Sequence, residues 1–198
     1  MDTGATLTRR RSPWVVFARH DDPWLSTETA ELQKLGGRVI HLDGRELSDP
    51  PALFAAFARE LSFPAYFGHN WDALVDCLHD WHGHGGETKD VAVLIDHADD
   101  LLGADFLGLF VSVLCQAAWQ ANLQLDADGA PNGDPPPHTL HFAFVLDTAP
   151  PTAFAEPAAS GMDVSVKRDE ERLTATSTGE DWPEADRELP SQEPRNRS

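Results

Sequence analysis

Apolar residues along the chain follow two alternating patterns. Short runs of apolar, β-branched and aromatic residues predict strands, and segments with apolar residues three and four positions apart predict helices. Strands are expected at residues 14–18, 38–42, 91–95 and 140–146, and helices at about 26–35, 52–61, 70–81 and 106–121. Strands that alternate with helices favour an α/β fold with a parallel sheet and right-handed crossovers.

The limits of this pattern divide the chain into three parts. Residues 1–11 are polar and are expected to form a flexible N-terminus, whereas residues 12–148 carry the alternating pattern. Within them, residues 12–36 are a strand–helix extension of a core at residues 37–148, and their strand is expected at one edge of the sheet. Residues 149–198 are rich in Pro, Ala, Ser, Thr and Glu, with 6 Lys and Arg against 11 Asp and Glu, which predicts a disordered acidic tail.

The helix expected at residues 70–81 carries two different faces. Its apolar stripe has the spacing of a buried helix face and consists of Trp71, Leu74, Leu78 and Trp81. An acidic row with a spacing of four residues consists of Asp72, Asp76 and Asp80. Like charges at this spacing repel each other, and no Lys or Arg lies between Phe63 and Trp81 to offset them. The row therefore favours a positively charged partner, with an ordinary solvated helix face as the alternative.

The net charge of −18 restricts the class of partner. Nucleic acid and anionic membranes both attract positive charge, so neither is expected as a direct partner. Residues 36–147 carry 4 Lys and Arg against 17 Asp and Glu, so the acidity belongs to the folded core as well as to the tail. Such a field accelerates the approach of a basic protein. No apolar run approaches the ~20 residues of a membrane span.

The cysteines and the N-terminus indicate a cytoplasmic protein. Cys77 and Cys115 both fall on expected apolar helix faces, so we expect buried free thiols, which fit a reducing cytoplasm. Arg9, Arg10 and Arg11 resemble a twin-arginine signal, but no apolar region of about 7–15 residues follows them. A signal peptide is therefore not expected.

Catalytic and metal chemistry find weaker support than a binding role. Four histidines near the acidic row offer metal ligands, but their spacing matches no zinc pattern: His69, His79, His82 and His84. An acid–base pair of carboxylates needs two different environments, which exposed Asp side chains at helical spacing do not supply. The chain has no Gly-x-Ser-x-Gly, Gly-x-Gly-x-x-Gly or P-loop motif, and acidic neighbours raise the pKa of Cys77. We expect no enzyme activity, no cofactor and no metal, with a weak hydrolase or a metal protein as alternatives.

The segment around the acidic row resembles a known family. Residues 64–78 read PAYFGHNWDALVDCL. This segment is similar to the signature of the barstar family, intracellular inhibitors of barnase-type ribonucleases, whose pattern is roughly Pro-x-Tyr-[Tyr/Phe]-Gly-x-Asn-x-Asp-Ala-Leu-x-Asp-x-Leu. Every fixed position of that pattern is matched. The order of strands and helices also agrees from about residue 38 to residue 147, a little over half of the chain.

The resemblance implies a barstar-like α/β fold and a role for each residue of the segment. The fold would have a parallel sheet of three strands with helices packed on it, here extended by the N-terminal strand. Asp76 would take the place of an RNA phosphate among the Arg and Lys side chains of the ribonuclease, with Asp72 beside it. Tyr66 would pack against the catalytic His of the enzyme, and Gly68 and Asn70 would shape the contact loop. The expected partner-binding face is completed by Phe67, Val75, His79, Asp80, Trp81 and Gln116.

This chain departs from the family pattern at three of these positions. Val75 stands where members with the best-known contact set have a Trp, and Asp80 adds a charge where they have a small residue. Gln116, which is neutral, aligns with a Glu that completes the acidic cluster of those members. The departures suggest that barnase itself is not the target, because changed contacts change partner choice.

The function that these observations favour is inhibition of a ribonuclease by a monomeric, cytoplasmic protein. The expected partner is a basic extracellular-type ribonuclease or a nuclease toxin, whose active site the acidic helix would plug. Two alternatives remain on the same fold. The chain could be a protein-binding module that does not inhibit a nuclease, or an immunity protein against a different basic toxin, as in a toxin–antitoxin pair.

Overall fold

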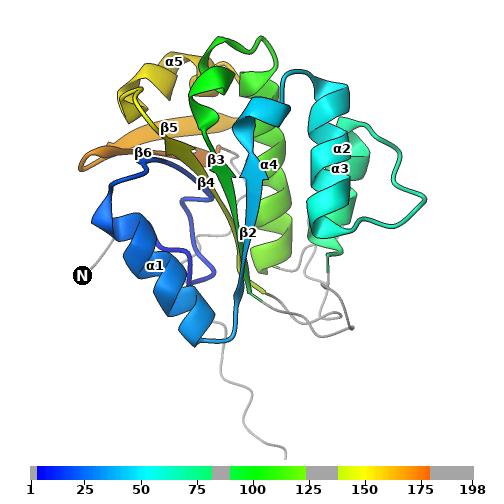
Figure 1. Ribbon diagram of the computed structural model, residues 1–198, viewed down its shortest axis with the longest axis horizontal. Coiled ribbons are helices and arrows are strands. Elements are labelled where there is room, and N and C mark those ends of the chain that lie inside the picture. The colour runs from blue at the N-terminus through cyan, green and yellow to red at the C-terminus, as the bar shows by residue number, and fades with distance from the viewer. Residues whose placement is uncertain (1–3, 82–89, 124–137, 179–198) are drawn as a thin grey trace, which may run out of the picture.

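A six-stranded mixed sheet forms the centre of the protein (Figure 1). The computed structural model describes residues 4–81, 90–123 and 138–178. The strand order is β2-β3-β4-β1-β6-β5, in which β2, β3, β4 and β1 are parallel and the last two strands are antiparallel to their neighbours. The strands are β1 (Val15–Arg19), β2 (Arg38–Asp43), β3 (Val91–Asp96), β4 (Leu140–Leu146), β5 (Val164–Asp169) and β6 (Arg172–Ser177).

Helices cover both faces of this sheet. The helix α1 (Pro23–Lys34) packs on one face, against side chains such as Leu94 and Val145. The other face carries a larger core that includes Phe142 and Phe144, and it is covered by α2 (Pro50–Leu61), α3 (Trp71–His79), α4 (Leu107–Leu123) and α5 (Ala155–Ala159). Because successive residues of a strand point to opposite faces, β3 and β4 are apolar at nearly every position. Three short 3-10 helices complete the fold, at Gly44–Glu46, Ala98–Gly103 and Pro151–Phe154.

The helices on either side of the sheet begin at acidic or amide caps. Asp22 accepts a hydrogen bond from the backbone N–H of Trp24 at 2.9 Å, and Pro23 takes the first helical position of α1. The expected start at residue 26 is therefore too late, because Pro23 already has the φ angle of a helix. Asp49 caps α2 in the same way, through a 2.8 Å bond from Ala52 N.

The N-terminal strand lies inside the sheet, so its expected place at an edge is wrong. Val15 pairs with Phe142 of β4 on one side and with Ala175 of β6 on the other. β1 is therefore buried on both faces, and its first four residues are fully enclosed. The expected sheet of three parallel strands plus one is accordingly too small: four strands are parallel, and a hairpin adds two more.

That hairpin comes from the segment expected to be a disordered tail. Residues 151–177 form a 3-10 helix, α5, β5 and β6, and the side chains of Phe154, Leu173 and Ala175 are at most 3% exposed. The apolar residues here are few and only some are buried, since Met162 is 76% exposed, but β6 pairs with β1 and is buried there. The structure therefore contradicts the expected disorder over residues 151–177, whereas residues 179–198 lie outside the described residues.

Arg172 ties the hairpin to α1. Its guanidinium lies 3.4 Å from Asp22 Oδ2 and 2.8 Å from Glu170 Oε2, and it stacks over the Trp24 ring at 5.2 Å. The Arg172 side chain is 10% exposed. A cation that is this deeply enclosed needs such partners, because an unpaired buried charge is strongly destabilising.

Residues 4–11 make specific contacts, in contrast to the expected flexible N-terminus. Leu7 is fully buried in the cluster beneath α1, and its N–H donates to Glu28 Oε2 at 2.7 Å. The Trp24 indole donates to Ala5 O at 2.8 Å. The segment thus covers apolar side chains of the sheet that α1 leaves uncovered.

A buried histidine fastens the same segment at its other end. The His141 ring, on β4, stacks on Trp14, and its Nε2 and Nδ1 atoms lie 2.8 and 3.2 Å from the carbonyl oxygens of Arg9 and Pro13. Burial lowers the pKa of His141, against the opposing effect of the two carbonyl groups. The ring is therefore neutral at neutral pH.

Candidate protein-binding site

The loop between α2 and α3 presents the single tyrosine of the chain to solvent. α2 ends at Ser62, which has a left-handed conformation, and a turn closes where Phe67 N donates to Pro64 O at 2.9 Å. Phe67 is 6% exposed and packs edge-on against Phe54 and Phe63. This anchor holds the loop against the domain and leaves Tyr66 84% exposed.

Gly68 and Asn70 together set the start of α3. The Asn70 side chain accepts a hydrogen bond from Ala73 N at 2.9 Å, which makes it the cap of the helix. The same side chain reaches back to donate to Gly68 O at 3.3 Å. A Cβ atom on Gly68 would lie 3.0 Å from Asn70 Nδ2. The two residues that the resemblance assigns to the contact loop therefore shape it through the helix cap.

The apolar side of α3 belongs to the core. Leu74, Val75 and Leu78 are at most 6% exposed. Trp81, just after the helix, is 7% exposed, donates its indole N–H to Leu61 O at 2.8 Å and lies under the Arg38 guanidinium. The sequence expects Phe67, Val75 and Trp81 on the partner-binding face. The structure encloses all three side chains, so their contact with a partner stays a prediction.

The acidic row lies on the opposite, exposed side of α3. Asp72, Asp76 and Asp80 are all exposed. Asp72 lies in the first turn, where the helix dipole favours a negative charge, and Asp80 is the C-cap residue. Within the part of the chain that the structure describes, no Lys or Arg forms an ion pair with these carboxylates. The row is therefore a negatively charged surface that no Lys or Arg of the described residues neutralises.

Two further expected contact residues lie on α3 and α4. His79, the last residue of α3, is largely enclosed, and its Nδ1 lies 2.7 Å from Asp80 Oδ1. Gln116 is exposed on α4, which packs against α3. The exposed members of the expected face are thus Tyr66, Gly68, Asn70, Asp72, Asp76, Asp80 and Gln116, with His79 partly exposed among them.

The cysteines of the chain are free thiols of low reactivity. Cys77, on α3, is partly buried, and burial, followed by the charges of Asp76 and Asp80, raises its pKa. Cys115 is buried in α4, where burial raises its pKa further. Both thiols are therefore protonated at neutral pH, and neither is an activated nucleophile.

Metal ligands do not converge in the described part of the structure. Among residues 4–81, 90–123 and 138–178, no group of three or more His, Cys, Asp or Glu side chains is placed to hold a metal ion. His69 stacks on Phe67 with a centroid distance of 4.7 Å. His82 and His84, which belong to the same alternative, lie outside the described residues. No helix in the described ranges is long and apolar enough to cross a membrane.

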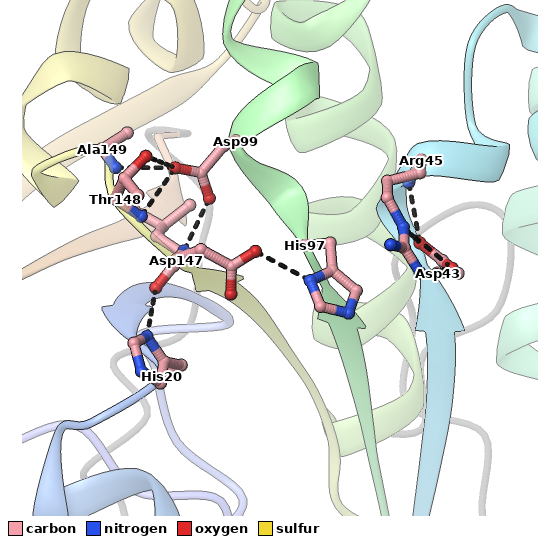
Figure 2. Close-up of polar contacts among 9 residues, drawn as sticks. His20, Asp43, Arg45, His97, Asp99, Asp147, Thr148 and Ala149 are labelled. Carbon is pink, nitrogen blue, oxygen red and sulfur yellow. Dashed lines mark hydrogen bonds and ion pairs between the residues drawn. The ribbon is translucent and has the colours of Figure 1, made fainter.

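The carboxyl ends of the parallel strands, where open α/β sheets bind ligands, carry a second set of polar residues (Figure 2). His97 Nδ1 lies 2.7 Å from Asp147 Oδ2, and Asp43 pairs with Arg45 at 2.7 Å. Asp99 accepts hydrogen bonds from the backbone N–H groups of residues 147, 148 and 149 at 2.6–2.9 Å. The contacts of His97 and Asp99 join the ends of β3 and β4, whereas the Asp43–Arg45 pair lies within the segment that follows β2. All of these side chains thus have structural partners.

The ionisation of Asp99 is expected to make the stability of the protein depend on pH. Partial burial opposes ionisation, but three backbone N–H donors and the Thr148 hydroxyl outweigh it and lower the pKa of Asp99 from 3.8 to about 2. The stabilising effect of the carboxylate is therefore complete above pH 3.8 and is lost as the pH falls towards 2. Asp99→Asn is expected to lower the free energy of unfolding by about 2 kcal/mol at pH 7 and to flatten its decline below pH 4.

Urea unfolding between pH 2 and pH 7 measures this effect. Asp100→Asn is the matched control, because Asp100 is the exposed neighbour and the substitution removes the same charge. Equal stability of the two variants at pH 7 would mean that the hydrogen bonds from residues 147–149 to Asp99 do not stabilise the fold.

Known proteins resemble part of this chain. Residues 37–126 match the family model described as Barstar (barnase inhibitor). A curated relative from Bacillus subtilis, named "Putative ribonuclease inhibitor YrdF", is 43% identical over 44 residues, which are 22% of this chain and 48% of the relative. The chain therefore spans about half the length of the curated relative it matches. The matched segment contains α2, the Tyr66 loop, α3 and α4, so the resemblance to the barstar family of ribonuclease inhibitors is confirmed over residues 37–126.

Proposed function

We propose that this protein inhibits a basic ribonuclease by inserting the exposed face of α3 and the Tyr66 loop into the active site of the enzyme. The observation that supports this most directly is the acidic row, whose three carboxylates are exposed and have no Lys or Arg partner among the described residues. Nuclease active sites are lined with cations that bind phosphate. A rigid row of carboxylates offers them a competing anion without a scissile bond.

Each exposed member of the face has a role in this proposal. The Asp76 carboxylate, at the middle of the row, takes the place of the RNA phosphate, and Asp72 pairs with a second cation. Tyr66 projects from the loop and packs against the catalytic His of the nuclease, as exposed aromatic side chains do at the centres of interfaces. The chain makes and breaks no bond, so we propose an inhibitor and not an enzyme, acting as a monomer in the cytoplasm.

The partner is proposed to be a ribonuclease or nuclease toxin other than barnase itself. Val75 is buried, so the aromatic contact implied by the family at this position is absent. Gln116 is exposed but neutral, whereas Asp80 adds a charge. These three positions favour an immunity role against a related basic toxin over recognition of barnase.

Association with a basic ribonuclease is expected to depend strongly on salt. The net charge of −18 steers an oppositely charged partner, and salt screens that attraction. Raising NaCl from about 0.05 to about 0.5 M is expected to lower the association rate constant by roughly tenfold or more, with a small change in dissociation. Stopped-flow association with a catalytically inactive barnase-type ribonuclease, together with inhibition of the active enzyme, measures both quantities. Inhibition with a salt-independent association rate would contradict the electrostatic mechanism.

A further inference from the structure

Asp80 continues the acidic row by one more helical turn. Its N–H donates to Asp76 O at 2.9 Å, the i to i−4 bond of an α-helix, and its φ and ψ angles are −84° and 4°. The last helical hydrogen bond therefore reaches Asp80, but its ψ angle is outside the helical range, and the residue is the C-cap, one position past the end of α3. Four residues of helix rise by about 6 Å, so the row from Asp72 to Asp80 spans about 12 Å along the helix axis and about 80° around it.

An aspartate at this position is unfavourable for the fold. The C-terminal end of a helix carries a partial negative charge, which repels a carboxylate. Asp76, four residues earlier, adds a second repulsion. Among the described residues Asp80 has no Lys or Arg partner, its one close side-chain contact is with the neighbouring His79, and its side chain is 69% exposed. A residue that opposes helix stability and points to solvent is better explained by binding than by folding.

His79 holds the Asp80 carboxylate in one direction. The His79 side chain is 16% exposed, so its ring has little freedom, and its Nδ1 lies 2.7 Å from Asp80 Oδ1. An anion oriented in advance loses less conformational freedom when a partner binds it. The structure therefore presents Asp80 as a positioned anion, as a binding residue requires.

We propose that Asp80, positioned by His79, is a third anionic contact, which selects nucleases whose RNA-binding cleft has a cation beyond those that meet Asp76 and Asp72. This rests on the proposed function, because the row must face the cleft. The three carboxylates then meet separate cations of the cleft, and the partner is a nuclease that binds its substrate along an extended track of Lys and Arg. A nuclease whose cleft has no cation beyond the scissile phosphate makes no contact with Asp80. Its affinity for this protein is therefore not raised by the third charge, which narrows the range of partners.

Neutralisation of Asp80 tests the contact, and the probe is a catalytically inactive barnase-type ribonuclease. Asp80→Asn is expected to lower affinity by about five- to tenfold, mainly through slower association, and to reduce the salt dependence of association. The same substitution removes the two repulsions but also weakens the contact with His79, so the Tm is expected to change by less than about 2 °C. Asp105→Asn is the matched control: Asp105 is also exposed, but it precedes Phe106, which packs against the first residue of α3 and not against its C-terminal end.

Variants of His79 separate positioning from packing. His79→Leu removes the donor to Asp80 and is expected to weaken binding as much as Asp80→Asn does, and the double variant is expected to bind no more weakly than either single one. His79→Asn keeps a donor near the Nδ1 position and is expected to retain binding within about twofold. Additive losses in the double variant would contradict the positioning role.

The outcomes separate this inference from the function on which it rests. If Asp76→Ala abolishes binding while Asp80→Asn binds like Asp105→Asn, the third contact is wrong and the inhibitor proposal stands. If Asp76→Ala has no effect, both are wrong. A double-mutant cycle between Asp80→Asn and single Lys or Arg substitutions of the nuclease identifies the cation, which is expected to differ from the one coupled to Asp76.

Discussion

Replacement of Asp76 by Ala is expected to lower the affinity for the partner ribonuclease by about 4 kcal/mol, roughly a thousandfold. Asp76 lies at the middle of the acidic row and is exposed in the free protein. In the proposed complex its carboxylate is enclosed by the cations that otherwise bind the phosphate. Truncation of one partner of such a pair leaves the cations of the nuclease buried and uncompensated, which is the costly part of the change. Most of the loss is therefore expected in the dissociation rate.

The same substitution is expected to leave the fold unchanged. Asp76 makes no ion pair with a described residue, and its removal relieves repulsion with Asp72 and Asp80. Calorimetric titration against the inactive ribonuclease measures affinity, and thermal unfolding measures stability, with Asp105→Ala as the matched control. Loss of binding accompanied by an equal loss of stability would place Asp76 in the fold and not in the interface. Unchanged inhibition of the ribonuclease would contradict the insertion of α3 into its active site.

The candidate site was predictable because most of its signal is local. The four-residue spacing of Asp72, Asp76 and Asp80 defines one helix face wherever the helix lies, and the motif at residues 64–78 suggests the roles that we propose for them. The burial of individual side chains was harder to predict from the sequence. Phe67 and Trp81 are enclosed by α2, through contacts with Phe54 and with the carbonyl of Leu61, and a helix wheel contains no information about such neighbours.

The sheet was only partly predictable because its order depends on pairing between distant residues. The four parallel strands are visible as apolar runs, with bounds within one residue of those observed. The order of these strands in the sheet is not visible in the sequence, since Val15 pairs with residues that are more than 100 positions away. The β5–β6 hairpin was missed for another reason: its strands are polar, with Lys167 and Arg168 on the exposed outer strand. This composition resembles that of a solvated tail, and the pairing with β1 that orders the hairpin cannot be inferred from it.

This hairpin lies outside the family match, so its contribution to stability can be tested separately from binding. A chain that stops at Thr148 loses the buried side chains of Phe154, Leu173 and Ala175, along with Arg172. It also turns β1 from an interior strand into an edge strand with unpaired backbone groups. Each large buried side chain contributes about 1.5–3 kcal/mol. The expected result is a loss of about 5 kcal/mol or more, comparable with the whole stability of an ordinary domain.

Denaturant unfolding of the shortened chain, compared with a chain that stops at Thr178, measures this loss. The second chain keeps β6 and its pairing with β1 and β5, so it controls for removal of acidic residues from the C-terminus. The chain ending at Thr148 is expected to unfold without a cooperative transition or at a much lower denaturant midpoint. Equal midpoints would mean that residues 37–148, with β1, form a stable unit and that the hairpin is an addition to it. A lower midpoint for the shorter chain makes the hairpin part of the scaffold that holds α3 and its acidic row in place, because β1 and β4 are the strands on which the α4 layer packs.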